Sequence, residues 1–128
     1  MDLKNYFDDT PGTGIMATAD SAGKVDAAVY SRPHVMDNGE IAFIMTDRLT
    51  HANLQTNPSA VYLFMEPGQG WKGKRLYLVK TREESDTDKI ESLMRRRHPP
   101  DVEKYKNQKK FLVYFKLEKE LPLVAVTE

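Results

Sequence analysis

The sequence contains no cysteine among its 128 residues. Disulfide bonds, iron–sulfur clusters and thiolate zinc sites are therefore excluded. It also lacks an excess of charge, because 19 basic residues balance 19 acidic ones. A neutral chain gives no reason to expect a nucleic acid as its partner. The three histidines, His34, His51 and His98, do not have the spacing of a metal site, so we predict no bound metal.

Long apolar runs are missing as well. No run approaches the roughly 18 residues that cross a membrane, and the longest, such as residues 61–65, have the length of a strand. Residues 1–6 lack the apolar stretch of a signal peptide. We therefore expect a cytoplasmic protein without a membrane partner. The length is typical of one domain, which we place over residues 1–128.

The distribution of apolar, turn and helix-breaking residues predicts a mainly β chain. Asn38-Gly39 is a strong signal for a tight hairpin, because both residues tolerate positive φ. Helical spacing begins at Leu49 and ends before Pro58. We expect strands over residues 15–19, 25–36, 41–46, 60–65, 76–81, 111–117 and 123–126. Further helices are expected over residues 3–8 and 87–96, with a polar helical turn over 101–108.

Mostly hairpin-connected strands do not follow a βαβ rhythm, which argues against a doubly wound parallel sheet. A small antiparallel barrel fits better, because closure removes exposed sheet edges. The predicted fold class is mainly β (α+β): a split barrel of six to seven antiparallel strands with two or three short helices.

The segment from Met45 to Leu54 is the most informative for function, because a strand ends and a helix begins there. Helix N-termini present unpaired N–H groups and a positive dipole, and so bind phosphate. Arg48 can add a charge-assisted fork, and Thr46 and Thr50 can add hydroxyl donors. The alternative is that Asp47 or Thr50 only caps the helix and Arg48 is a solvated charge.

Two other segments carry polar side chains suited to a ligand. On a strand, Arg32 shares one face with Tyr30 and His34, while Ser31 faces the other side. Such a face lines a ligand groove or is an ordinary wet surface. Residues 68–75 place Trp71 and three cations on a Gly-rich loop. This loop suits stacking on a planar anion or on a partner subunit, and the alternative is a plain hairpin loop.

Three runs of residues, taken in order, are familiar. They are Ala17 to Val25, then Asp37 to Thr46, then Asn53 to Val61, which closes on Asn57-Pro58 before a strand. Over about residues 14–66 the chain resembles the pyridoxamine 5′-phosphate oxidase-like, FMN-binding split-barrel family, with weaker likeness through residue 82. In that family FMN lies across the second and third strands, and its phosphate meets the strand-to-helix turn.

The resemblance implies a set of FMN-binding residues. Met45 and Thr46 match the pair that contacts the flavin phosphate and ribityl chain, and Asn53 lies in the following matched run. Arg48, Thr50 and His51 lie where the family has a Ser-Arg-Lys phosphate clamp, although this chain lacks the lysine. Ser31 and Arg32 lie on the strand beside the isoalloxazine. Trp71 and Arg75 resemble loop positions that reach the partner's flavin in a homodimer.

The resemblance leaves the activity open. The C-terminal Arg and His signature of the true oxidase does not occur here, so oxidation of pyridoxamine phosphate is not expected. The leading interpretation is an FMN-dependent oxidoreductase or flavin electron carrier, with an unidentified small-molecule substrate or redox partner. No catalytic residue is identified. The alternatives are a non-enzymatic dimeric module that stores flavin or binds haem through His34 or His51, and a dimeric structural or regulatory protein with an empty groove.

Overall fold

The computed structural model describes residues 2–94 and 109–124 as seven strands and three helices. The strands form one antiparallel sheet in the order β2-β1-β5-β6-β7-β4-β3. Their bounds are β1 Thr13–Ala19, β2 Val25–Tyr30, β3 His34–Val35, β4 Ile41–Thr46, β5 Ser59–Met65, β6 Gly73–Glu84 and β7 Lys110–Pro122. The helices are α1 Leu3–Asp9, α2 Leu49–Thr56 and α3 Thr87–Leu93. The predicted fold class is confirmed.

The sheet curves into a barrel whose two edge strands, β2 and β3, follow each other in the chain. Only residues 31–33 join them, so the chain itself crosses the split between the edges. The Tyr62 hydroxyl lies 3.1 Å from the carbonyl oxygens of both Tyr30 and Ser31 and donates to them at this crossing. Pro33, which cannot donate to a sheet, directly precedes the second edge strand.

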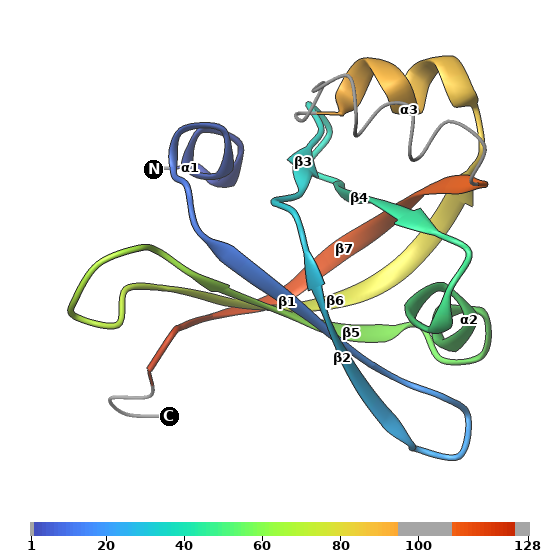
Figure 1. Ribbon diagram of the computed structural model, residues 1–128, viewed down its shortest axis with the longest axis horizontal. Helices are drawn as coiled ribbons and strands as arrows, with labels where there is room; N and C mark the ends of the chain where they lie inside the picture. The colour runs from blue at the N-terminus through green and yellow to red at the C-terminus, as the bar shows by residue number, and fades with distance from the viewer. Residues whose placement is uncertain (1, 95–108, 125–128) are drawn as a thin grey trace.

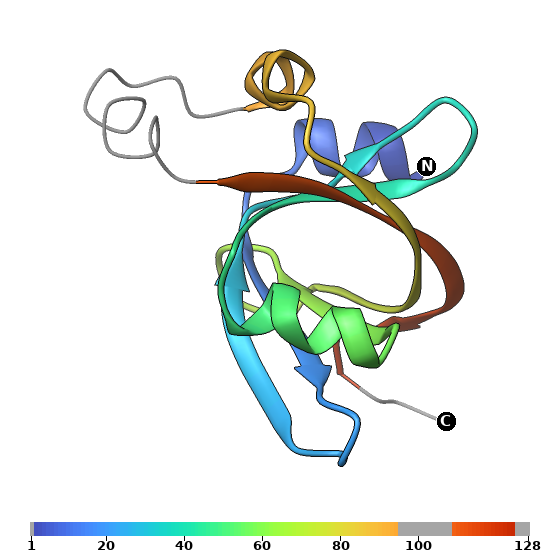
Figure 2. The same ribbon diagram turned by 90° about the vertical axis from the view of Figure 1, so that its right-hand side faces the viewer.

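The helices occupy different parts of the barrel. Helix α2 lies across one end and α1 lies at the other, while α3 packs outside on β4 and β7 (Figures 1 and 2). Strand β7 explains why α3 is needed. Its run Phe111-Leu112-Val113-Tyr114-Phe115 is buried at every position. Phe111, Val113 and Phe115 face the barrel interior, and Leu112 and Tyr114 pack with Ile90 of α3.

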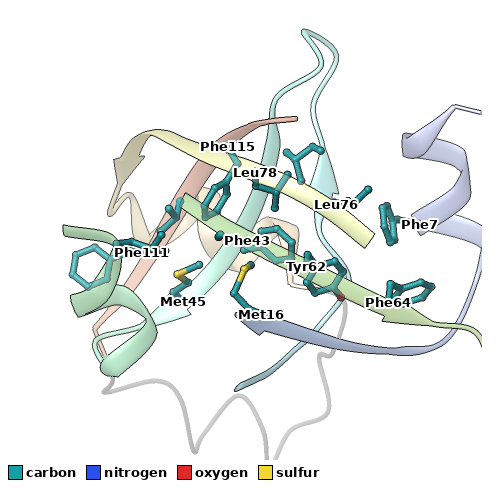
Figure 3. Close-up of a cluster of buried hydrophobic side chains, with 14 of the residues drawn as sticks. Phe7, Met16, Phe43, Met45, Tyr62, Phe64, Leu76, Leu78, Phe111 and Phe115 are labelled. Atoms are coloured by element: carbon teal, nitrogen blue, oxygen red, sulfur yellow. The ribbon is translucent and has the colours of Figure 1, made fainter. Parts of the chain in front are cut away.

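The barrel interior is filled by alternate residues of the strands, as the period of two requires (Figure 3). The aromatic rings meet mostly edge to face, as for Phe7 and Phe64, whose centroids are 5.1 Å apart. The fully buried large side chains are Tyr62, Tyr114, Phe7, Phe43, Phe64, Phe115, Met16, Ile41, Met45, Leu76, Leu78 and Ile90.

Several predicted boundaries were wrong. The strand expected over residues 25–36 breaks after Tyr30, because the chain crosses the split at residues 31–33. Strand β6 extends beyond the expected 76–81, because its charged end pairs with β7 up to Glu84. Strand β7 runs without a break to Pro122, and Leu123 and Val124 form a bend instead of a strand. The helix predicted over residues 87–96 ends at Leu93, and the predicted turn over 101–108 lies outside the described residues.

The close packing around Gly14 generates a test of the barrel core. A Cβ atom at Gly14 would collide with the ring and hydroxyl of Tyr62. We therefore expect Gly14→Ala to lower the free energy of unfolding by about 1–3 kcal/mol, as overpacking does. Urea denaturation measures this loss. In a Tyr62→Leu background the same substitution should cost much less, and an undiminished cost would show that Tyr62 is not the obstacle.

Candidate functional site

The turn between β4 and α2 places an uncapped helix N-terminus at the surface. Strand β4 ends at Thr46, and Arg48 occupies the N-cap position in an extended conformation. The Arg48 side chain makes no capping hydrogen bond and is exposed. By contrast, aspartates cap the other two helices: Asp2 accepts from the Asn5 N–H, and Asp86 from the Lys89 N–H. The first turn of α2 therefore offers backbone N–H donors, a positive dipole end and a guanidinium.

Buried polar contacts fix α2 on the barrel. Thr50 and Asn53 are buried, and the Asn53 amide donates to the Thr18 hydroxyl at 3.1 Å. Thr50 hydrogen-bonds the Tyr30 side chain of β2. Burial raises the pKa of Tyr30, an effect that the hydrogen bond with Thr50 opposes. Hydrogen bonds of this kind are directional, so they set the position of the helix more narrowly than apolar contact alone.

His51 lies in the same turn, with only 6% of its surface exposed. Its ring stacks on Phe111, with centroids 3.9 Å apart and planes 12° from parallel. Each ring nitrogen faces a carboxylate: Nδ1 lies 3.3 Å from Asp47 Oδ1, and Nε2 lies 3.0 Å from Glu83 Oε2. His51 thus connects the residue before the helix cap to strand β6.

Glu83 is the centre of this cluster. Lys80 Nζ lies 2.6 Å from its Oε1, and the Gln55 amide donates to the same oxygen at 3.0 Å. Partial burial raises the pKa of Glu83, but the hydrogen bonds from Lys80, Gln55 and His51 together outweigh it and lower the pKa to about 2. Glu83 is therefore ionised at neutral pH.

Five of the residues implied by the resemblance meet at this corner: Thr46, Arg48, Thr50, His51 and Asn53. Their roles differ. Thr46 and Arg48 border the open N-terminus, whereas Thr50, His51 and Asn53 are buried contacts of the helix. Met45 is buried in the core, so only its backbone is available to a ligand.

Ser31 and Arg32 lie at the crossing between the sheet edges. Arg32 Nη1 donates to the carbonyl oxygens of Phe7 at 2.7 Å and Thr10 at 3.0 Å. The guanidinium therefore satisfies carbonyl groups at the end of α1. Ser31 is exposed, and its carbonyl oxygen accepts from Tyr62.

Trp71 and Arg75 are not at the α2 corner. The loop between β5 and β6 projects from the opposite end of the molecule (Figure 1). Trp71 is 72% exposed there and has a φ of 52°, which is uncommon for any residue but glycine. Arg75 lies on β6, and its Nε donates to the Pro122 carbonyl at 2.8 Å.

The outer face of the sheet is apolar over four strands. Val25 and Val29 of β2 are 80% and 76% exposed. The strand register places further apolar side chains beside them, namely Ile15, Ala17, Ala19, Ala27, Val61, Leu63, Tyr77 and Val79. We call this set the outer face. A groove of about 300 Å³ lies on it and is lined by Ala17, Thr18, Ala19, Val25, Asn57, Ser59, Ala60, Val61, Tyr77, Leu78 and Glu118.

Two features are absent from the described part of the chain. No group of three or more His, Asp or Glu side chains there is arranged to hold a metal ion. No helix among residues 2–94 and 109–124 is long and apolar enough to cross a membrane.

The sequence reasoning missed Glu83 and Lys80. They lie 32 and 29 positions after His51, on the charged end of a strand that was expected to stop at residue 81. The charge pattern of residues 80–84 resembles a solvated strand end. Only the pairing of β6 with β7 brings Glu83 under α2.

The chain matches no protein-family model and no curated protein. Its fold, however, recurs in solved structures. An FMN-binding protein from Syntrophomonas wolfei subsp. wolfei has a TM-score of 0.73 and 20% identity, covering 98% of this chain and 86% of that one. HutZ, the haem storage protein from Vibrio cholerae, has a TM-score of 0.71 and 17% identity, covering 94% and 91%.

A third similar structure comes from Lactobacillus delbrueckii and carries the provisional name of a pyridoxamine 5′-phosphate oxidase. Its TM-score is 0.63 at 15% identity, covering 93% of this chain and 89% of that one. At these identities the likeness lies in the fold. The chain therefore has the pyridoxamine 5′-phosphate oxidase-like split-barrel fold, as the sequence resemblance implies.

The lowered pKa of Glu83 generates a prediction about acid stability. Because the folded pKa is about 2 against an ordinary 4.5, the stabilisation is fully present above pH 4.5 and is lost as the pH falls toward 2. Glu83→Gln should lower the melting temperature near neutral pH and flatten its decline through that acid window. Calorimetry at several pH values measures both effects. Asp37→Asn, in the exposed turn between β3 and β4, is the control, and an equally steep decline in both variants would contradict the assignment.

Proposed function

We propose that this protein binds FMN, with the flavin phosphate at the N-terminus of α2. The observation that carries the proposal is the uncapped first turn of α2 beside the exposed Arg48. A dianionic phosphate suits this place, because it accepts from backbone N–H groups and pairs with both the dipole and the guanidinium. The shared fold with an FMN-binding protein supports the same choice.

The residues at the corner fit a phosphate in complementary ways. Arg48 supplies the charge-assisted contact, and Thr46 supplies a hydroxyl and a backbone edge. Thr50 and Asn53 hold the helix in place through Tyr30 and Thr18. Met45 contributes backbone only. The family's clamp lysine is absent here, so Arg48 carries the side-chain charge at this site.

FMN bound at this site would supply one- and two-electron redox chemistry, and this underlies our proposal of an oxidoreductase or flavin electron carrier. The chain's own contribution is to orient the flavin and to place charge near it. Arg32 would not reach the isoalloxazine while its guanidinium holds the end of α1. The protein would act on a small-molecule substrate or exchange electrons with a redox partner.

We also propose that the protein works as a homodimer through the outer face. Exposed Val25 and Val29 continue into an apolar surface over four strands, and covering such a surface drives association. A twofold axis would use the same face on both copies. A second copy would also explain how Trp71 and Arg75 can contribute to a flavin site although they lie far from α2 of their own chain. Because their end of the barrel lies opposite α2, only the partner's loop would bring them to a flavin site.

Haem is the alternative ligand, favoured by the fold shared with a haem storage protein. Both ring nitrogens of His51 face carboxylates, so its ring is engaged. Axial ligation would fall to His34 on β3, or would require His51 to leave these carboxylates. The visible spectrum of protein incubated with FMN or with haem and then desalted separates the two ligands, because the chromophores differ. Retention of haem and loss of FMN would overturn the flavin proposal.

The phosphate contact gives the sharper test. Arg48→Ala should weaken FMN binding by about 1.5–3 kcal/mol, the contribution of a hydrogen bond to a charged group. Riboflavin lacks the phosphate, so its affinity should change little. Quenching of flavin fluorescence gives both dissociation constants. An equal loss for the two ligands would show that Arg48 does not read the phosphate.

The outer face gives a prediction about assembly. Sedimentation at micromolar concentration should yield twice the chain mass of 14.7 kDa. Val29→Asp should shift the protein to the monomer, because it would bury a charge in the interface without disturbing the folded chain. Ala22→Asp, in the exposed turn between β1 and β2, is the matched control and should leave the dimer intact. A monomer that binds FMN tightly would exclude this interface.

A further inference from the structure

Asp47 occupies an unusual position beside α2. It directly precedes the N-cap residue Arg48 and so lies next to the positive end of the helix dipole. Its Oδ1 lies 3.3 Å from His51 Nδ1, which turns the carboxylate toward the ring. Asp2 and Asp86 differ from Asp47, because they are themselves N-cap residues and accept from the first turns of α1 and α3.

The His51 ring, which contacts Asp47 through Nδ1, is fixed by other residues on its opposite side. Phe111 stacks against the His51 ring, and Glu83 pairs with Nε2. Lys80 and Gln55 in turn fix the Glu83 carboxylate. A series of contacts therefore leads from strand β6 through His51 to Asp47. Rotation of the ring would break at least two of these contacts.

The Asp47 carboxylate can adopt another position when its contact with His51 is lost. Its side chain is 64% exposed, so it has room to rotate. A carboxylate that turns toward the first-turn N–H groups of α2 is stabilised there by the helix dipole. A carboxylate at that point would take the donors that a phosphate needs and would repel the phosphate charge.

We propose that His51 and Glu83 are positioning residues that hold Asp47 away from the N-terminus of α2 and so keep that terminus open for an anion. The inference rests on the proposed flavin function, because the anion is the FMN phosphate. It gives His51 a role different from the one that the resemblance implies. The ring does not touch the phosphate, and its effect on affinity passes through Asp47.

The test is a double-mutant cycle between His51 and Asp47, read with FMN and riboflavin. His51→Phe retains an aromatic ring on Phe111 and removes both nitrogens. It should weaken FMN binding about tenfold, the size of a charge effect at a helix N-terminus, and leave riboflavin affinity unchanged. Adding Asp47→Ala should restore FMN affinity to that of Asp47→Ala alone, because no carboxylate is left to compete.

The outcomes separate the inference from the function on which it rests. If the unaltered protein retains no FMN, the proposed function fails. If it binds FMN and His51→Phe binds equally well, or if Asp47→Ala does not rescue His51→Phe, the positioning role is wrong. A loss of riboflavin affinity equal to that of FMN would also overturn it, because that loss reports damage to the whole site.

A second variant keeps the test decisive if His51→Phe does not fold. Glu83→Gln removes the charge that holds the ring but preserves the side-chain shape. FMN affinity should fall severalfold and should recover when Asp47→Ala is added. Glu84→Gln is the matched control, because Glu84 pairs with Lys89 near α3 instead. Equal effects of Glu83→Gln and Glu84→Gln would contradict the proposal.

Discussion

The three residues that cross from β2 to β3 are the constraint on which the architecture depends. The two edge strands, β2 and β3, are joined directly by residues 31–33. The barrel is therefore closed by the chain itself and not by pairing between these strands. The Tyr62 hydroxyl donates to the carbonyl oxygens of Tyr30 and Ser31 at this crossing. Arg32 ties the same crossing to α1. Helix α2 is fixed on β1 and β2 through Thr18 and Tyr30, the last residue of β2 before this crossing.

Local patterns were enough to predict much of this fold. The Asn38-Gly39 hairpin and β4 follow from turn chemistry and alternation, and α2 follows from its apolar spacing and Pro58. The β4–α2 turn was recognised as a candidate anion site because helix termini have the same chemistry in every fold. The contacts that a residue makes across the fold could not be predicted in this way. Arg32 was placed by its strand pattern, whereas its partners lie on α1, more than 20 residues away.

The cluster around Glu83 could not have been predicted, for a physical reason. Strands β6 and β7 pair with two shifts in register, and the second falls between Lys80 and Arg82. Such a shift changes which side chains point inward, and single-sequence alternation does not reveal it. The sequence therefore predicts that the polar ends of both strands are exposed to solvent, although Glu83 contacts His51 of α2. In a site that combines a helix terminus with a residue from a distant strand, the sequence predicts the helix terminus but not the contribution of the strand.

The run from Phe111 to Phe115 is exposed in the unfolded chain, before the barrel has formed. Its five consecutive apolar residues serve two cores in the folded chain, but in an unfolded chain they form a short segment prone to intermolecular β-stacking. Lysines stand at both ends, with Lys109 and Lys110 before the run and Lys116 after it. Like charges at these positions repel neighbouring copies of the segment, as gatekeeper residues do. The lysines thus protect newly made chains from aggregation during the interval before α3 and the barrel cover both faces.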